Sequence, residues 1–307
     1  MIDAGTRQSA TTDLGVVRLR IHDLDLEVRT DTPAVLDAVT TSYSAFLADD
    51  VAPSSTGTGA RANAEWVVTR RSDDGWELSH GRGETVGTAH ETGAVLGTLD
   101  RIVMSVIGGL GERGIIGTHA GALCINGRAV VLAGKSGAGK STLTLALLRN
   151  GASFLTDELT LIGPDDRTVL PYPRALHVSP STVELVPEFR FLQTRPRQDL
   201  GGGSEWSVST ADLDRAFGSV VAGPTPLGAI VLLDERGDAI EAPSISPVTG
   251  AETAIALLRG TPAAGDDFSG TLARLAAIAG SVPTLRLRAT ELSWTAAVLR
   301  DHLAALP

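Results

Sequence analysis

The sequence predicts an α/β fold in which a small β-rich N-terminal subdomain precedes a larger domain. Three observations favour it. An apolar run at 130–133 passes through a glycine-rich loop into a helical pattern. Apolar residues alternate with polar ones at several places before residue 90, and helix-like and strand-like segments alternate after it. The chain of 307 residues is long enough for the two domains that we predict, at residues 1–90 and 91–307.

Composition and charge exclude several classes of protein. The net charge of −10 argues against a nucleic acid or an anionic membrane as the main partner. Cys124 is the single cysteine, so no internal disulfide forms, and no Cys/His cluster has zinc spacing. The N-terminal segment lacks the apolar stretch of a signal peptide, and no apolar run is long enough to span a membrane. We therefore expect a cytoplasmic protein.

The first ninety residues predict a small α+β unit. Alternating residues at 16–28 predict two strands on either side of His22 and Asp23, and Pro33 opens a helical pattern. A Ser/Thr/Gly-rich loop at 49–62 precedes two further strands, at 64–68 and 76–78. This subdomain has no catalytic spacing, so a structural cap and a recognition element for a protein substrate remain as alternatives.

A helix and a hairpin lead into the centre of the chain. Apolar positions recur at helical spacing over 95–107. Asn126-Gly127 then predicts a two-residue hairpin between strands at 118–125 and 128–133. Opposed residues in this hairpin have numbers that sum to 253, so His119 would face Gly134 at about 4.5–5.5 Å. This register predicts an imidazole beside the loop that follows.

The loop itself has the P-loop pattern Gly134-x-x-x-x-Gly139-Lys140-Ser141, between a strand and a helix. Its glycines let backbone N–H groups close around phosphate oxygens, and the helix N-terminus adds its positive end. Lys140 would reach the outer phosphates, and the Ser141 hydroxyl would hold Mg²⁺. The pattern predicts binding of a nucleoside triphosphate by Gly134, Ser136, Gly137, Ala138, Gly139, Lys140, Ser141 and Thr142.

An acidic pair follows the P-loop helix. A strand at 153–156 ends in Asp157-Glu158, 17 residues after Lys140, which leaves room for one helix and a return strand. A parallel strand reached in this way normally lies beside its partner, and ligands gather at the carboxyl ends of such strands. The flanking residues are apolar, so we expect burial near a metal rather than a solvated turn.

The remaining chain offers fewer signals. Pro171-Tyr172-Pro173 holds the backbone extended before Arg174, which either clamps a phosphate or a substrate carboxylate or is an ordinary surface arginine. Residues 187–215 combine arginines with three consecutive glycines, a composition that fits a mobile lid or plain disorder. Further strands are predicted at 227–233 and 284–287, and helices at 251–258, 273–279 and 294–306.

Taken in order, His119, the P-loop, Asp157-Glu158 and Pro171-Tyr172-Pro173-Arg174 resemble the HPr serine kinase/phosphorylase family. The chain is most similar to the HPr-kinase-like peptide serine kinases of lasso-peptide (RiPP) gene clusters, and the resemblance covers about residues 90–300. It implies a P-loop kinase fold related to phosphoenolpyruvate carboxykinase, with ATP and Mg²⁺ as cofactors. The Glu-Arg-Gly-Leu-Gly loop of true HPr kinases is absent, which argues against HPr as the substrate and against the reverse phosphorylase reaction.

The resemblance also implies roles for single residues. Asp157 would be the base for the incoming hydroxyl, and Glu158, with Ser141, would lie on the metal side. The catalytic set that we predict is Asp157, His119, Lys140 and Arg174.

The leading hypothesis is an ATP-dependent kinase acting on a hydroxyl, a serine, of a peptide or protein such as a natural-product precursor. The alternatives are a nucleotide-dependent regulatory or binding module and a small-molecule kinase. The sequence leaves open the acceptor, the phosphoryl donor, and whether the protein forms a homo-oligomer.

Overall fold

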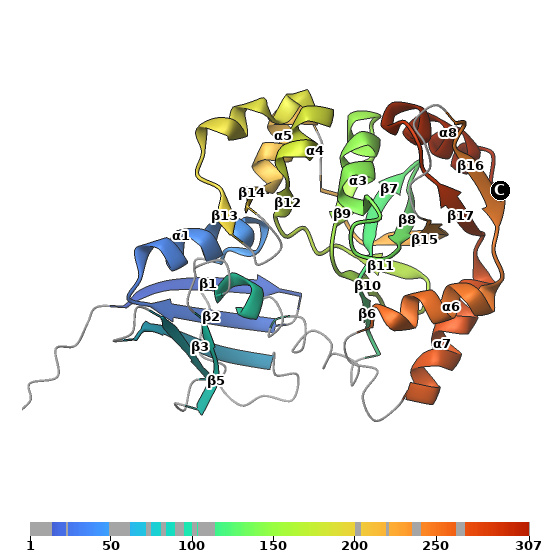
Figure 1. Cartoon of the computed structure of the whole chain (residues 1–307). Coiled ribbons are helices and arrows are strands. Elements are labelled where there is room, and N and C mark those ends of the chain that lie inside the picture. Colours follow the sequence, from blue (N-terminus) through green and yellow to red (C-terminus); the bar gives the residue numbers. More distant parts are fainter. Residues whose placement is uncertain are drawn as a thin grey trace, which may run out of the picture. The chain divides into compact units, whose positions relative to one another are not determined.

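The computed structural model separates into two compact units, Met1–Thr40 with Phe46–Leu96, and Thr41–Ala45 with Gly97–Pro307. Figure 1 shows its helices and strands. The predicted division into functional domains at residue 90 stays a prediction. The structure describes residues 14–22, 24–48, 62–71, 75–80, 84–89, 95–99, 103, 114–199, 204–218, 221–234, 241–261 and 268–306.

The first unit is built on one five-stranded sheet in the order β1-β2-β3-β4-β5. The predicted first hairpin is present, with Leu19 opposite Leu26, and His22 takes a φ of 52° at its turn. Leucine and valine side chains on one face of the hairpin are buried because the sequence alternates. The elements of this region are β1 (Gly15–Ile21), β2 (Leu24–Thr30), α1 (Pro33–Ser42), η1 (Ser44–Phe46), β3 (Ala62–Arg70), β4 (Trp76–His80) and β5 (Glu84–Ala89).

The predicted helix over 95–107 is described only in part. Residues 95–99 are helical, and Val95, Leu96 and Leu99 are buried. Of the remaining positions only Val103 is described, so the predicted end of this helix lies outside the described residues.

The second unit contains a central sheet in the order β16-β17-β15-β8-β7-β9. Strands β8, β15 and β17 are parallel, and β9 runs in the same direction because both it and β8 pair antiparallel with β7. Their carboxyl ends therefore meet at one edge of the sheet. The strands are β7 (Gly121–Ile125), β8 (Arg128–Ala133), β9 (Ser153–Thr156), β15 (Thr225–Leu233), β16 (Ser244–Pro247) and β17 (Thr284–Arg288).

Three short strands extend this sheet from the start of β15. β11 (Thr168–Leu170) pairs with β15 and with β10 (Thr160–Ile162), which in turn pairs with β6 (Ile116–Thr118). Thr160 lies opposite Thr118, so this arm holds the backbone just before His119.

Helices cover both faces of the central sheet (Figure 1). α3 (Lys140–Arg149) and α8 (Leu292–Ala304) pack on one face, while α6 (Gly250–Arg259) and α7 (Phe268–Ser281) pack on the other. Successive side chains of β8 pack alternately into the hydrophobic cores on the two faces of the sheet. Val130 and Leu132 face α3, and Val131 faces α6 and α7. This double burial explains why β8 is an uninterrupted apolar run.

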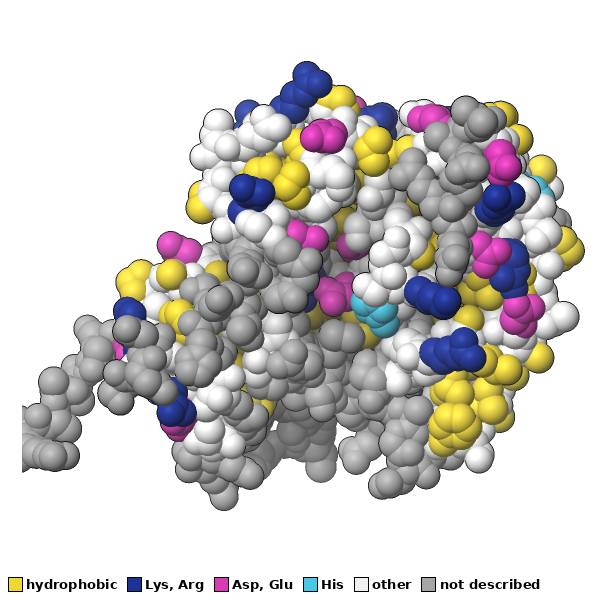
Figure 2. Space-filling view, viewed as in Figure 1, with side chains coloured by type: hydrophobic (Ala, Val, Ile, Leu, Met, Phe, Trp, Pro, Cys, Tyr) yellow, Lys and Arg dark blue, Asp and Glu magenta, His cyan; other side chains and the backbone are white. Residues whose placement is uncertain are grey.

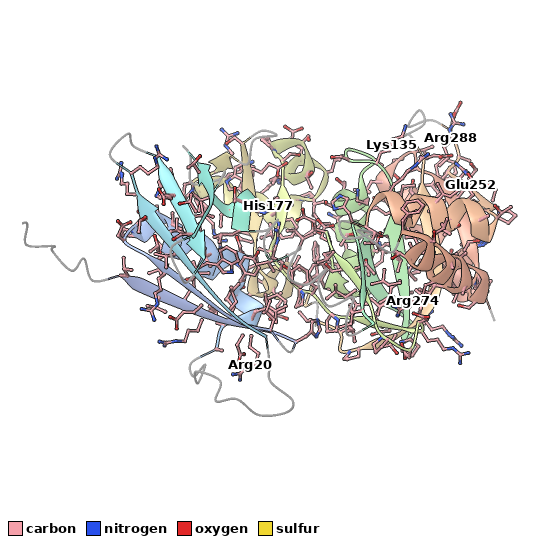
Figure 3. The ribbon with its side chains drawn as sticks, turned by 90° about the horizontal axis from the view of Figure 1, so that it is seen from below. Arg20, Lys135, His177, Glu252, Arg274 and Arg288 are labelled. Atoms are coloured by element: carbon pink, nitrogen blue, oxygen red, sulfur yellow. The ribbon has the colours of Figure 1, made fainter. Side chains whose placement is uncertain are left out.

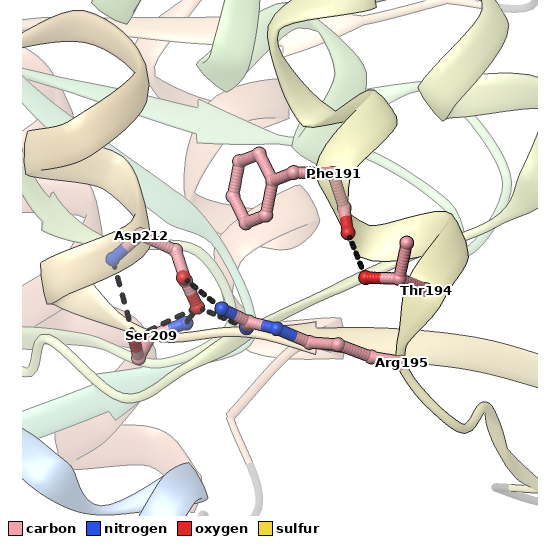
Figure 4. A network of polar contacts seen from close by, with 5 residues as sticks. All are labelled: Phe191, Thr194, Arg195, Ser209 and Asp212. Atoms are coloured by element: carbon pink, nitrogen blue, oxygen red, sulfur yellow. Dashed lines mark hydrogen bonds and ion pairs between the residues drawn. The ribbon is translucent and has the colours of Figure 1, made fainter.

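The segment predicted to be irregular, 187–215, forms ordered structure wherever it is described. A three-stranded sheet in the order β12-β14-β13 carries two helices and a 3₁₀ segment. Figure 4 shows the contacts that join them: Arg195 donates two hydrogen bonds to Asp212, which also caps α5 through Ser209. The triple glycine at 201–203 lies outside the described residues. The elements are β12 (Leu176–Val178), α4 (Pro180–Leu185), η3 (Pro187–Thr194), β13 (Gln198–Asp199), β14 (Ser204–Val208) and α5 (Thr210–Phe217).

Two details of the predicted pairing are wrong. The hairpin has the predicted register, with Gly121 opposite Leu132, but the ladder ends there, so His119 does not pair with Gly134. The strand predicted at 118–125 breaks instead into β6 and β7, because β6 turns to pair with β10. Strand β9 does not lie beside β8 either, since β7 lies between them.

Within the described part of the chain, no helix combines the length and the apolar character needed to cross a membrane.

Candidate functional site

The P-loop connects β8 to α3, and its glycines are explained by the backbone. Gly139 caps α3 with a φ of 89°, and Gly137 has a φ of 80°, values that favour glycine. Gly134 is favoured by close packing instead. A Cβ there would lie 3.1 Å from the Leu233 carbonyl oxygen and 3.2 Å from the Leu233 Cβ. The end of β15 thus packs directly against the loop.

Lys140 and Ser141 begin α3 and extend toward the loop and the end of β9. Lys140 is 8% exposed, and its Nζ donates hydrogen bonds to the carbonyl oxygens of Gly134 at 3.0 Å and Lys135 at 3.2 Å. Burial lowers the pKa of Lys140, and the charges of Asp157 and Glu158 oppose that shift. An ammonium group that is held by two carbonyl groups in a polar cavity is well suited to bind phosphate oxygens.

Asp157 follows β9 and contacts the P-loop helix. Ser141 Oγ donates a 2.7 Å hydrogen bond to Asp157 Oδ2, while Asp157 Oδ1 is buried without a hydrogen bond among the described residues. Burial raises the pKa of Asp157 to about 6; the hydrogen bond from Ser141 and the charge of Lys140 act against this rise, and Glu158 adds to it. A carboxylate with a pKa near neutrality and a free lone pair can accept a proton or bind a cation.

His119 reaches the site from the break between β6 and β7. Its backbone N–H donates a 2.6 Å hydrogen bond to the Gly260 carbonyl oxygen at the end of α6, and Thr118 Oγ1 donates to the Leu257 carbonyl oxygen at 2.8 Å. A Cβ on Gly260 would lie 3.1 Å from the His119 nitrogen, so a glycine permits this close approach. Burial, then the charge of Lys140, lowers the pKa of His119, which favours the neutral imidazole.

Arg174 is a residue of the site rather than an ordinary surface arginine. It is 6% exposed, and its NH2 group forms a 2.7 Å ion pair with Glu158 Oε2. The extended Pro-Tyr-Pro segment is held by the Tyr172 N–H, which donates to the Leu155 carbonyl oxygen in β9 at 2.9 Å. This bond places Arg174 beside the residues that follow β9.

One cavity of about 690 Å³ brings most of the predicted site residues together. In the space-filling view, acidic and histidine side chains lie next to one another at a hollow of the surface (Figure 2). Gly134 and Ala138 do not line this cavity, and Ala138 lines a second cavity on the other side of the loop. The predicted residues that line it are His119, Ser136, Gly137, Gly139, Lys140, Ser141, Thr142, Asp157, Glu158 and Arg174.

The sequence did not indicate the wall of the cavity that comes from β12, the start of α4 and β14. This wall contains His177 on β12, labelled in Figure 3, Ser179 at the start of α4, and Glu205 on β14. His177 Nδ1 lies 3.4 Å from the Ser207 hydroxyl. Alternation at 204–208, where Trp206 and Val208 are buried, could have indicated a strand there.

Glu205 adds a third carboxylate to the cavity. Burial raises the pKa of Glu205, and the charge of Glu158 raises it further. The described lining thus combines two cations, Lys140 and Arg174, with the carboxylates of Asp157, Glu158 and Glu205. The cations suit phosphate oxygens, and the carboxylates suit a hydroxyl, a cationic group or a metal ion.

The donor set also fits a magnesium ion. Among the described residues, no group of three or more His, Cys, Asp or Glu side chains could hold a metal ion by itself. Mg²⁺ is usually held by one or two carboxylates together with phosphate oxygens and water. Ser141 and Glu158 supply such a partial set beside the P-loop.

Similarity to known proteins is found among solved structures. No protein-family profile matches the chain, and no curated protein matches it. A solved structure that does match is the HPr(Ser) kinase/phosphatase from Coxiella burnetii, at 15% identity and a TM-score of 0.31, over 61% of this chain and 95% of that one.

Proposed function

We propose that this protein is a kinase that transfers the γ-phosphoryl group of ATP to a hydroxyl group, a serine of a peptide or protein. The observation that carries the proposal is the single cavity that joins the P-loop residues Lys140 and Ser141 to Asp157, His119 and Arg174. Phosphoryl transfer depends mainly on positioning and charge neutralisation, and this cavity supplies groups for both.

The nucleotide would lie along the P-loop. Lys140 would exchange its two carbonyl partners for the outer phosphates, and the loop amides would bind the remaining oxygens. Mg²⁺, held by Ser141 and Glu158, would neutralise phosphate charge when bound. Arg174 would compensate the charge that builds up on the transferred group.

The acceptor hydroxyl would enter between Asp157 and the wall formed by β12 and β14. Asp157 would take its proton while the oxygen forms a bond to the γ-phosphorus and the bond to the bridging oxygen breaks, so that ADP leaves. A pKa of about 6 supports Asp157 as this base, because it is ionised at neutral pH and remains basic enough to accept the proton. A neutral His119 would orient the Asp157–Glu158 turn or donate a hydrogen bond to the γ-phosphoryl group.

The test is transfer of label from γ-labelled ATP, with Mg²⁺, to a pool of serine-containing peptides that includes natural-product precursor peptides. Asp157→Asn should reduce transfer by at least about 100-fold, the usual size of a general-base effect, and keep ATP binding. Asp214→Asn is the matched control because Asp214 is exposed on α5 and does not line the cavity. If ATP binds and no hydroxyl is labelled, the acceptor class is wrong.

The roles of Asp157 and Glu158 can be separated by how each variant depends on the Mg²⁺ concentration. Glu158→Gln should raise the Mg²⁺ concentration needed for half-maximal transfer, because it removes a carboxylate from the metal side. Asp157→Asn should reduce the rate even at saturating Mg²⁺. If instead Asp157→Asn raised the Mg²⁺ requirement and Glu158→Gln reduced the rate at saturating Mg²⁺, Asp157 would be the metal ligand. Asp157 already contacts Ser141, and that result would contradict its role as the base.

A further inference from the structure

A second cavity, of about 550 Å³, lies on the other side of the P-loop. Ser136 and Gly137 line both cavities, so the loop forms the ridge between them. Beyond the loop, the lining comes from Leu233 and Asp234 at the end of β15 and from Arg288 at the end of β17. The loop residue Lys135 also lines it.

The position of this cavity favours a ligand. β8, β15 and β17 are adjacent and parallel, and the cavity lies at their carboxyl ends, where open α/β sheets bind ligands. A triphosphate that ends at Lys140 and Ser141 has to leave the P-loop at its other end. Since the P-loop lines both cavities, the second one can receive whatever is attached to the inner phosphate.

The side chains suit a nucleoside. Leu233 and Ala138 give an apolar surface, and Asp234 offers a carboxylate whose Oδ1 is held by Arg286 NH1 at 2.8 Å. Arg286 also pairs with Glu252 of α6, so one guanidinium lies between the Asp234 carboxylate and that helix. A carboxylate at the end of a parallel strand is a common partner of ribose hydroxyls.

Arg288 and Lys135, both labelled in Figure 3, supply positive charge on the same cavity. Arg288 forms a 2.8 Å ion pair with Glu241 in which both side chains are about half exposed. Such a pair contributes little free energy, so the guanidinium can leave it at low cost to stack on a flat ring.

We propose that this second cavity is the nucleoside subsite of the phosphoryl donor. Asp234 binds the ribose hydroxyls, and Leu233 and Arg288 hold the base, while the triphosphate crosses the P-loop into the first cavity. This assignment rests on the proposed kinase function, and it names the residues that distinguish ATP from a bare polyphosphate.

The experiment compares the affinities of ATP and inorganic tripolyphosphate, each with Mg²⁺, by calorimetry. Asp234→Ala and Arg288→Ala should each weaken ATP binding by about tenfold or more and change tripolyphosphate binding by less than about twofold. Arg300→Ala and Asp301→Ala are matched controls because these residues form a similar exposed pair on α8 and do not line the second cavity. Thermal unfolding of each variant confirms that it folds.

Two outcomes would overturn the inference while the proposed function stands. In one, both variants bind ATP as the wild type does; in the other, ATP and tripolyphosphate lose affinity equally. If the wild type binds neither ligand, the proposed function fails, and the subsite fails with it.

A second measurement uses the lysines. The chain has only two, Lys135 and Lys140, both in the P-loop, and Lys135 is exposed on the second cavity. ATP should slow acetylation of Lys135, followed by mass spectrometry, by several-fold more than tripolyphosphate does. Equal protection by the two ligands would place the nucleoside elsewhere.

Discussion

The Ser141 hydroxyl donates a 2.7 Å hydrogen bond to Oδ2 of Asp157, and this bond joins the first turn of α3 to the end of β9. Helix α3 follows β8 and Asp157 follows β9, and these two strands are separated by β7. The bond stabilises the ionised form of a carboxylate that burial makes hard to ionise. The protonation of Asp157 therefore depends directly on a P-loop side chain.

Replacement of this donor should change the acidity of Asp157. In Ser141→Ala the carboxylate loses a hydrogen bond that lowers its pKa, so the pKa of Asp157 should rise above its value of about 6. Carboxyl ¹³C titration of aspartate-labelled protein in EDTA, assigned with Asp157→Asn, measures the shift. Ser141→Thr keeps a hydroxyl and serves as the control. An unchanged or lower pKa in Ser141→Ala would contradict the contact.

Ionisation of Asp157 should make the metal-free protein less stable as pH rises. The pKa in the folded protein is about 6, whereas an unperturbed Asp titrates near 3.9. The unfolded chain therefore loses this proton first, and stability falls between about pH 4 and pH 6 and then levels off. Asp157→Asn removes this cost and should be more stable than the wild type above about pH 6, by an amount on the order of 2–3 kcal/mol.

Urea unfolding in EDTA between about pH 4 and pH 8 measures this difference. The difference should shrink to about 0.5 kcal/mol near pH 4, where Asp157 is protonated in the folded wild type and about half protonated in the unfolded chain. Asp214→Asn should show no such dependence, because Asp214 is exposed. A variant that is less stable than the wild type at pH 8 would show that Asp157 is not strained by burial.

The first glycine of the P-loop should not tolerate a side chain. In Gly134→Ala the new Cβ would lie 3.1 Å from the Leu233 carbonyl oxygen and 3.4 Å from the Ala138 Cβ, so β15 or the loop has to move. We expect a loss of about 1–3 kcal/mol in the free energy of unfolding, as for other overpacked sites, together with weaker ATP binding.

Gly280 gives the matched control for this substitution. It lies in α7, and a Cβ there has no atom within 4 Å. Gly280→Ala should be neutral or should stabilise the fold by about 0.4–1 kcal/mol. Chemical denaturation and calorimetry measure both variants. Equal stability of the two alanine variants would contradict the close packing at Gly134.

The α5 cap should hold the wall of the cavity in place. Asp212 accepts hydrogen bonds from Arg195 at 2.8 and 2.9 Å and forms a capping box with Ser209 at the start of α5, directly after β14 (Figure 4). Asp212→Ala should cost about 1–3 kcal/mol, because it removes a cap and half of an ion pair. Asp214→Ala, on the exposed side of the same helix, should cost much less.

This contribution has the opposite pH dependence to that of Asp157. Burial acts to raise the pKa of Asp212, but the hydrogen bonds from Arg195 and Ser209 outweigh it and hold the pKa below its usual value. The stabilisation should be present above about pH 4 and lost as the pH falls through the folded-state pKa. Thermal unfolding over about pH 2.5–7 measures it, and a constant difference between variant and wild type would contradict it.

The local parts of the site could be predicted from the sequence because they depend on neighbouring residues. The strand–loop–helix order around Lys140, the turn at Asn126-Gly127, and the strand that ends before Asp157 each arise from patterns within about ten residues. Apolar–polar alternation likewise predicted the first two strands, and the helical pattern that Pro33 opens predicted the first helix.

Long-range pairing decided the rest, because strand partners and cavity walls depend on contacts between residues far apart in the chain. No local pattern shows that β7 lies between β8 and β9, or that β6 pairs with β10. The hydrogen bond from the His119 N–H to the Gly260 carbonyl oxygen and the ion pair between Arg174 and Glu158 are equally long-range. The same holds for Glu205, which reaches the cavity only through the pairing of β14 with β12. The sequence alone thus determined the glycine-rich loop and the buried strands around it, and the tertiary structure decided which side chains face that loop.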